Sequence, residues 1–326
     1  MMDDAHPREL FTRYDGNPII TGDSFPEVVN AVLNPAATMF DGQTLLLLRV
    51  EDRTGISRLV VARSPDGFTG WEIDTERGLS PDPERFEEHW GIEDPRITKI
   101  GDEYLIVYTG FSQGGPLVCL AATRDFVTFE RRGVLHPPED KDAALFPERF
   151  QGLWALIHRP APATFGLSTN MWISFSPDLR YWGDAQVVLP ARRGGWWDAN
   201  KVGPGPPPLL TERGWLICYH GVKTTASGSI YRLGLALLDR DEPAKVLLRG
   251  REWVFGPDAP YECSGDVPGV VFPCGWLLDD DGDTVRMYYG GADKVVAVAT
   301  ASLRKLLHHL EHHASDGTDE AVDPGE

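Results

Sequence analysis

The sequence predicts an all-β fold, a five-bladed β-propeller with a short C-terminal helix, on three observations. A unit of two short apolar strands and an aspartate-containing turn recurs five times, at a spacing of about 50–60 residues. The chain of 326 residues contains 34 glycines, 26 prolines and 10 tryptophans, which is typical of many short strands joined by turns. Convincing helical periodicity occurs near the C-terminus. Repetition of a strand unit at this period indicates a radial arrangement of blades.

The first unit begins at residues 28–40 and turns at Asp41-Gly42, a dipeptide typical of hairpins. The run 44–50 that follows is largely apolar, which indicates a strand buried on both faces. Pairs of strands are expected at 44–50 and 57–62, 104–109 and 117–122, 153–157 and 171–175, 214–219 and 232–237, and 284–289 and 294–300. Because these pairs share one repeat, we expect a single five-bladed β-propeller domain over residues 1–313.

The predicted helix covers residues 303–313 and begins after Ser302, a good N-cap residue. Leucines lie on one face of it, at positions 303, 306, 307 and 310. Its histidines form two pairs with i, i+4 spacing, His308 with His312 and His309 with His313. Such pairs can bind zinc, but on an ordinary amphipathic helix solvated or packing histidines are favoured, and we expect no metal. Residues 314–326 are acidic and contain glycine and proline, which predicts a disordered tail.

The net charge of −18 argues against nucleic-acid or anionic-membrane partners, which require basic surface. An anionic substrate must therefore be held by a local basic cluster. The first residues are polar and acidic, unlike a signal peptide, and no apolar run approaches the ~18 residues of a membrane span. A cytoplasmic location is expected, and a homo-oligomer is a candidate assembly. The four cysteines, Cys119, Cys218, Cys263 and Cys274, lack C-x-x-C spacing and are expected to be reduced packing residues.

The segment Gly91-Ile92-Glu93-Asp94-Pro95-Arg96 is the centre of the functional argument. Two adjacent acids precede a proline and an arginine, just before a predicted strand at 103–109. Pro95 is expected to favour extended geometry at Asp94, so that the carboxylate is held stiffly at or before the start of a strand. Such a carboxylate beside a cation can act as an acid or base. Taken alone, the tetrapeptide Glu93–Arg96 is more often a turn with a local Asp–Arg ion pair.

Four further stretches carry more polar side chains than strands require. They are Arg49-Val50-Glu51-Asp52-Arg53, the run 141–149 with His158-Arg159, the run 196–208 leading to Tyr219-His220, and the run 288–294. A charged channel mouth and an exposed hairpin loop are equally good interpretations of the first. Tandem tryptophans at 196 and 197 suit a sugar face, although core tryptophans are favoured. Lys201 and His220 could supply cations.

These motifs, in this order from about Asn34 to Asp293, resemble glycoside hydrolase family 130, the β-mannoside phosphorylases and related β-mannosidases. The resemblance implies a five-bladed propeller and an inverting phosphorylase that transfers a mannosyl residue to inorganic phosphate, giving α-mannose 1-phosphate. Inorganic phosphate would be a co-substrate, and no cofactor is expected. Asp94 would be the catalytic acid, which protonates the leaving oxygen through the 3-hydroxyl of the sugar.

The resemblance also assigns the remaining site residues. Phosphate would be bound by Lys141, Arg159, Lys201, His220 and Tyr231. The sugar would be bound by Asn34, Arg49, Asp52, Arg53, Glu93, Phe272 and Asp293. Lys141 stands where some members have arginine, and Glu148 lies close to it in sequence, so the phosphate contacts are expected to be shared differently here.

Phosphate is already an anionic nucleophile, so a phosphorylase needs cations opposite its acid, whereas an inverting hydrolase needs a second carboxylate as base. The prominent acid and the basic residues of this chain therefore favour phosphorolysis. The alternatives are an inverting β-mannosidase, with Glu51, Glu93 or Glu148 as base, and a non-catalytic sugar-binding propeller. Linkage and acceptor, β-1,2 or β-1,4 and mannose, glucose or N-acetylglucosamine, are expected to depend on loops such as 78–88 and 223–230.

Overall fold

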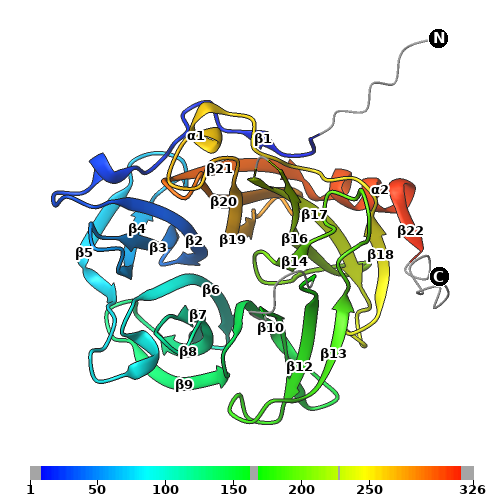
Figure 1. Ribbon diagram of the computed structural model, residues 1–326, viewed down its shortest axis with the longest axis horizontal. Coiled ribbons are helices and arrows are strands. Elements are labelled where there is room, and N and C mark those ends of the chain that lie inside the picture. The colour runs from blue at the N-terminus through cyan, green and yellow to red at the C-terminus, as the bar shows by residue number, and fades with distance from the viewer. Residues whose placement is uncertain (1–8, 162–167, 227, 317–326) are drawn as a thin grey trace.

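Five antiparallel sheets lie in a ring around a common centre in a computed structural model that describes residues 9–161, 168–226 and 228–316 (Figure 1). The predicted five-bladed propeller is confirmed. The innermost strands of the five blades are β2, β6, β10, β14 and β19, and in blades 1 to 3 the chain moves outward from them strand by strand. The predicted strand pairs are the second and third strands of the five blades.

The blades have the following bounds. Blade 1 contains β2 (Ala31–Phe40), β3 (Gln43–Glu51), β4 (Ser57–Ser64) and β5 (Glu72–Leu79). Blade 2 contains β6 (Ile92–Ile100), β7 (Glu103–Gly110), β8 (Leu117–Thr123) and β9 (Glu130–His136). Blade 3 contains β10 (Asp140–Phe150), β11 (Leu153–Pro160), β12 (Met171–Ser176) and β13 (Gly183–Leu189). Blade 4 contains β14 (Lys201–Pro204), β15 (Leu209–Thr211), β16 (Gly214–Thr225), β17 (Gly228–Leu238), β18 (Val246–Gly250) and β22 (Ala314–Asp316). Blade 5 contains β19 (Val271–Leu278), β20 (Thr284–Gly291), β21 (Val295–Ser302) and β1 (Thr12–Arg13).

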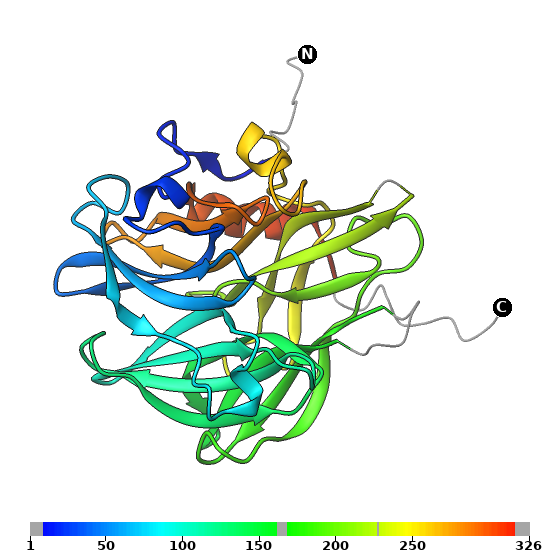
Figure 2. The ribbon, with the colours of Figure 1, turned by 60° about the vertical axis from the view of Figure 1, so that its left-hand side comes forward.

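Strand β1 comes from the N-terminal segment, yet it forms the outer edge of the last blade. It pairs antiparallel with β21, with Thr12 opposite Thr300. Next to it, the Arg13 guanidinium donates to the buried Glu262 carboxylate of helix α1 (Pro260–Cys263) at 2.8 Å. Figure 2 shows this helix beside the N-terminal segment. The N-terminal segment thus completes the last blade, which closes the ring of blades.

The apolar pattern of the chain explains which strands could be predicted. Leu45, Leu46, Leu47 and Leu48 of β3 are all fully buried, as the continuous apolar run indicated. The outer strands β5, β9 and β13 are largely exposed and polar, so no apolar pattern marks them. Short 3-10 helices at Gly22–Ser24 and Phe86–Glu88 lie in the connections before blades 1 and 2.

The C-terminal helix α2 (Leu303–His313) is confirmed, and the Ser302 hydroxyl accepts a hydrogen bond from the backbone N–H of Lys305 at its start. Leu303, Leu306 and Leu310 are buried against blades 4 and 5. The prediction of a disordered tail from residue 314 is wrong for its first three residues, because β22 pairs with β18. Residues 314–316 form backbone hydrogen bonds with the exposed edge of β18, and the polar sequence of this segment has no periodicity that would predict such pairing. Residues 317–326 lie outside the described residues.

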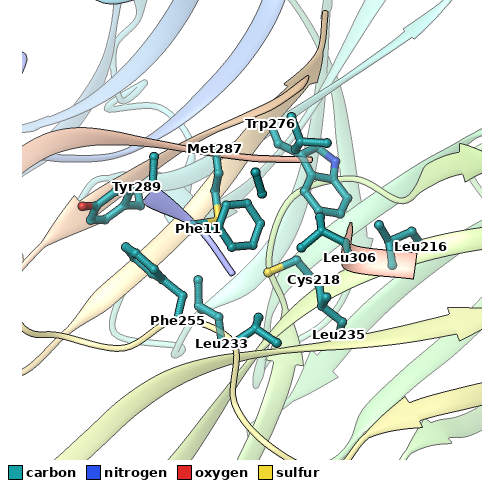
Figure 3. Close-up of a cluster of buried hydrophobic side chains, with 14 of the residues drawn as sticks. Phe11, Leu216, Cys218, Leu233, Leu235, Phe255, Trp276, Met287, Tyr289 and Leu306 are labelled. Atoms are coloured by element: carbon teal, nitrogen blue, oxygen red, sulfur yellow. The ribbon is translucent and has the colours of Figure 1, made fainter. Parts of the chain in front are cut away.

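The cluster between blades 4 and 5 contains Phe11, Phe255, Trp276, Met287 and Leu306 (Figure 3). Phe11 immediately precedes β1, is 3% exposed, and meets Phe255 edge-on with ring centroids 6.0 Å apart. Because aromatic side chains contribute large apolar areas, this residue anchors the closing strand. The four cysteines are free, and three of them, Cys119, Cys218 and Cys274, are buried as packing residues, whereas Cys263 is exposed.

The closure therefore predicts a strong effect of Phe11→Ala. The variant should lose about 3–5 kcal/mol of unfolding free energy, because a large aromatic group is removed from a packed interior. Urea denaturation monitored by tryptophan fluorescence measures this difference. Phe86, which is 56% exposed, offers a matched control, since Phe86→Ala should change the value by about 0.5 kcal/mol or less. Equal losses in the two variants would show that β1 does not hold the ring closed.

Candidate active site

Three neighbouring inner strands carry the same irregularity near their starts. Register shifts interrupt the pairing of β2, β6 and β10 with the next strand of each blade. At each shift one residue has a positive φ, Asn34 at 45°, Asp94 at 49° and Asp142 at 55°. Asn and Asp tolerate this left-handed region better than other non-glycine residues. The expectation of extended geometry at Asp94, just before a strand, is therefore wrong: the residue lies within β6, at a bulge that overrides the influence of Pro95.

Asp94 is 3% exposed and receives hydrogen bonds from two residues of blade 1. Its Oδ1 accepts from Asn34 Nδ2 at 2.8 Å and from Arg49 Nη1 at 3.0 Å. Arg49 also donates to Glu93 Oε1 at 2.9 Å and to the Ser57 hydroxyl at 3.0 Å, which fixes its guanidinium plane. The predicted cation beside the acid is thus Arg49, contributed by another blade.

Arg96 does not form the local ion pair with the Asp94 carboxylate that the tetrapeptide allowed. Its Nη1 donates to the backbone oxygen of Asp94 at 2.9 Å, and its Nε and Nη2 donate to the backbone oxygens of Gly205 and Pro204. Because its side chain is 1% exposed, these bonds satisfy a buried guanidinium. Arg96 thereby joins blade 2 to the glycine- and proline-rich run of blade 4.

The surrounding charges decide the ionisation of Asp94. Burial disfavours its charged form, but the positive charges of Arg49, Lys141 and Arg96 outweigh burial and hold the pKa of Asp94 below its ordinary value. In the ligand-free site Asp94 is therefore a carboxylate. A bound anion on the same cations would weaken their effect on it.

A basic group lies on blade 3 beside this acid. Lys141 of β10 pairs with Arg159 of β11, and the Lys141 ammonium lies 4.0 Å from Glu93 Oε2. Arg159 donates from Nε to Asp142 Oδ2 at 2.7 Å, and its Nη2 lies 2.6 Å from the same oxygen. Asp142 is fully buried, and these cations hold its pKa well below the usual range despite that burial. Asp142 therefore orients the Arg159 guanidinium.

Blade 4 contributes two groups whose charged forms are disfavoured by their surroundings. Burial, together with the nearby Arg159 and Lys141, lowers the pKa of Lys201. Burial lowers the pKa of His220 to about 3, so its ring is neutral near pH 7. His220 Nε2 lies 3.6 Å from Asp142 Oδ2. His220 can therefore act as a neutral hydrogen-bonding group, and not as the cation that was expected.

Aromatic rings pack around His220. Its ring centroid lies 6.1 Å from that of Tyr231 and 4.8 Å from that of Phe272. Gly203 allows the backbone of β14 to approach, since a Cβ there would lie 2.6 Å from the His220 ring and 2.8 Å from Arg159. The glycine- and proline-rich run thus provides close backbone approach to the basic group.

Asp293 lies between β20 and β21, with φ at 49°. Burial and the negative charge of Asp94 raise its pKa to about 6, although Arg49 acts in the opposite direction. Gly290 on the same hairpin is required for close approach, since a Cβ there would lie 2.1 Å from Asn34 Oδ1. Asp293 and Asp94 therefore lie near each other with pKa values moved in opposite directions, an arrangement typical of functional sites.

Several candidate residues lie away from this centre. Asp52 closes the turn after β3, where its Oδ1 accepts from the backbone N–H groups of Thr54 and Ile56, and Arg53 is exposed in the same turn. Glu148 lies farther along β10 and is bonded to Arg240, so it does not share phosphate contacts with Lys141. The structure brings together Asn34, Arg49, Glu93, Asp94, Lys141, Arg159, Lys201, His220, Tyr231, Phe272 and Asp293.

Asp142 is the member of the site that the sequence argument missed. It directly follows Lys141 in the run 141–149. Asn34, Asp94 and Asp142 occupy the same bulge in consecutive blades, so superposition of the inner strands of the repeats would have found it. Of the tandem tryptophans, Trp197 is a core residue as favoured, stacked on Tyr219 with centroids 5.6 Å apart, whereas the same expectation is wrong for Trp196, which is 40% exposed.

One group in the described part of the chain has the residue types of a metal site. Atoms of His136, Asp140 and His158 lie within 4.8 Å of one another. Both ring nitrogens of His158 already have partners, Asp140 Oδ2 at 2.6 Å and the Ser174 hydroxyl at 2.8 Å. Hydrogen bonds of His158 therefore join β10, β11 and β12, and Asp140 directly precedes Lys141 in the chain. None of the helices described is long and apolar enough to cross a membrane.

Comparison with known proteins agrees with this geometry. The family model described as β-1,4-mannooligosaccharide phosphorylase, glycoside hydrolase family 130, matches residues 8–312. A β-1,4-mannooligosaccharide phosphorylase of Ruminococcus albus is 33% identical over 95% of this chain and 94% of its own. A β-1,2-mannobiose phosphorylase of Listeria innocua is 39% identical over 80% of this chain and 71% of its own.

A solved structure of the β-1,2-mannobiose phosphorylase from Listeria innocua, in complex with β-1,2-mannobiose, has the same fold. It superposes with a TM-score of 0.85 at 33% identity, covering 93% of this chain and 99% of that one. The residues matched by the family model, 8–312, span all five blades. The chain therefore belongs to glycoside hydrolase family 130.

Proposed function

We propose that the protein is an inverting phosphorylase of β-mannosides, which transfers a mannosyl residue to inorganic phosphate. The observation that supports this most directly is the pairing of Lys141 with Arg159 beside the buried Asp94. A buried acid next to cations provides both an acid for the leaving group and a place for an anionic nucleophile. The relatives named above are phosphorylases of β-1,4- and β-1,2-linked mannosides. The proposal is therefore stated for β-mannosides of either linkage.

In the proposed reaction, phosphate binds to Lys141, Arg159 and Lys201, with His220 and Tyr231 adding neutral hydrogen-bonding groups. Asn34, Arg49 and Asp293 hold the mannosyl residue over Asp94. A phosphate oxygen forms the new bond to the anomeric carbon while the glycosidic C–O bond breaks. The leaving oxygen receives a proton from the sugar 3-hydroxyl, which takes one from Asp94. The products are α-mannose 1-phosphate and the shortened sugar.

The low pKa of Asp94 in the free site fits an acid that is activated by its co-substrate. A phosphate dianion at Lys141 would offset part of the positive charge acting on Asp94. The pKa of Asp94 would then rise, and the group would take up a proton as phosphate binds. Protonation of the acid is thereby linked to occupancy of the nucleophile site.

Hydrolysis is the second candidate, and it requires a carboxylate free to activate water. Glu93 is bound to Arg49 at 2.9 Å, Glu51 accepts from Asn30 at 3.0 Å, and Glu148 is bound to Arg240. These three acids are therefore held by other partners, which favours phosphate over water. A cytoplasmic location and a homo-oligomer stay predictions.

Phosphate dependence decides between the two reactions. Purified protein should release mannose 1-phosphate from β-mannobioses only when inorganic phosphate is present, because phosphate supplies the nucleophile. Both β-1,4- and β-1,2-mannobiose should be supplied, with products separated by anion-exchange chromatography. Free mannose formed at a rate independent of phosphate would identify a hydrolase and contradict the proposal.

Asp94→Asn should lower kcat by about 10²–10⁴-fold, since general acid catalysis contributes this range. Circular dichroism should show an intact fold, because the amide retains the shape of the carboxylate. Phosphate should still bind, but the proton uptake that accompanies its binding to the unaltered protein should decrease. Calorimetric titration in two buffers of different ionisation enthalpy measures that uptake. Full turnover by the variant would remove Asp94 from the mechanism.

Asp293→Asn should make the protein more stable near neutral pH but less active. Because the folded-state pKa is raised to about 6, ionised Asp293 destabilises the native protein as the pH rises from the unfolded value of 3.8 through 6. The variant should therefore be about 1–2 kcal/mol more stable above pH 6 and equal to the parent at low pH. Its kcat/KM for mannosides should fall about tenfold or more, because a hydroxyl acceptor is lost. Urea denaturation at several pH values and initial rates test both effects; a constant stability difference would contradict the assignment.

A further inference from the structure

A pair of buried polar side chains in blade 3 has no part in the proposed reaction, yet it is adjacent in the chain to residues that have one. His158 of β11 and Asp140 of β10 are 3% and 4% exposed. Asp140 directly precedes Lys141, and His158 directly precedes Arg159. Because successive side chains of a strand point to opposite faces of the sheet, the buried pair and the two cations of blade 3 lie on different faces.

A single tautomer of a neutral imidazole satisfies both hydrogen bonds of His158. An ionised Asp140 can only accept, so His158 Nδ1–H donates to Asp140 Oδ2 at 2.6 Å. Nε2 then accepts from the Ser174 hydroxyl of β12 at 2.8 Å. The His136 ring of β9 stacks on the His158 ring, with centroids 4.1 Å apart. Burial and His158 lower the pKa of His136 to about 3, so no repulsion between two charged rings opposes this stacking near pH 7.

The backbone ladder between β10 and β11 is interrupted next to the two cations. Lys141 is opposite Arg159, and regular pairing resumes only at Ala144. His158 follows the interruption on β11 and therefore faces the bulge of β10, where it has no regular backbone partner in that strand. Its side-chain hydrogen bond to Asp140 crosses between the strands at this point. This bond therefore holds β10 and β11 together where the ladder does not.

We propose that His158 and Asp140 are positioning residues for phosphate, which fix the distance between the two cations of blade 3. This role rests on the proposed function and adds to it a determinant of phosphate affinity. On the side of the site, Asp142 orients the Arg159 guanidinium by accepting from Nε at 2.7 Å. The bond between His158 and Asp140 fixes the backbones that carry the cations. Because phosphate needs donors at fixed separations, a small shift between the two strands weakens its binding.

Two variants of His158 with side-chain amides test this role. In His158→Asn the amide can take the place of Nδ1 and donate to Asp140, whereas in His158→Gln it takes the place of Nε2 and reaches Ser174 only. For His158→Gln we expect the KM for phosphate to rise about tenfold. The KM for the mannoside should change about twofold or less, because the sugar-holding residues lie on blades 1 and 5. His158→Asn should keep both KM values within about threefold of those of the unaltered protein.

Initial rates over a matrix of phosphate and β-mannobiose concentrations give both KM values. Asp140→Ala should raise the KM for phosphate as much as His158→Gln does, and the double variant should add about twofold or less, because both changes remove the same hydrogen bond. Asp178 gives a control for stability, since it accepts from the backbone N–H groups of Arg180 and Tyr181 in the turn after β12 of the same blade. Asp178→Ala should lower the melting temperature measured by circular dichroism and leave the KM for phosphate unchanged.

An equal rise of the KM for phosphate in His158→Asn and His158→Gln, or no rise in either, would overturn the positioning role. Absence of phosphorolysis with every mannoside would instead refute the proposed function. In that case calorimetric titration of inorganic phosphate into the unaltered protein and both variants tests the positioning role directly. Weaker binding by His158→Gln than by His158→Asn supports the role, whereas equal affinities, or no binding by the unaltered protein, exclude it.

Discussion

Pairing of buried charges at the centre of the ring is the constraint on which the rest of the structure depends. Asp94 and Asp142 are almost inaccessible to water, and an isolated carboxylate in such a place would cost several kcal/mol. Asp94 is compensated by Arg49 from blade 1, and Asp142 by Arg159 of its own blade with His220 of blade 4 nearby. Because Arg49 and Asp94 come from different blades, the charge of Asp94 is balanced only when blades 1 and 2 pack against each other.

The same pairing prepares the centre for chemistry. Arg49 is held in one plane by Asp94, Glu93 and Ser57, and Arg159 by Asp142, so little reorganisation is needed when a ligand arrives. The basic group lies on blades 3 and 4, whereas the sugar-holding groups lie on blades 1 and 5. In the proposed reaction, a displacement with inversion requires phosphate and the leaving oxygen to lie on opposite faces of the anomeric carbon.

Much of this architecture could be predicted from local pattern. Apolar second and third strands recur in each unit, and the burial of Leu45–Leu48 shows why their signal is strong. The outer strands are exposed and lack it, and β1 and β22 pair with strands far away in sequence. Most residues of the candidate site could be predicted from motifs and family resemblance. Asp142 was missed, because only a comparison of the inner strands shows that it occupies the same bulge position as Asn34 and Asp94.

The sequence by itself determined the repeat, the number of blades and most of the residues that meet at the centre, because strand periodicity and short motifs are local properties. Only the tertiary structure decided the partners and the charge states. Arg49, and not the neighbouring Arg96, faces the Asp94 carboxylate, because a bulge in β6 turns that side chain towards blade 1. His220 is neutral near pH 7 and the pKa of Asp293 is raised to about 6, because desolvation and neighbouring charges depend on distances across blades.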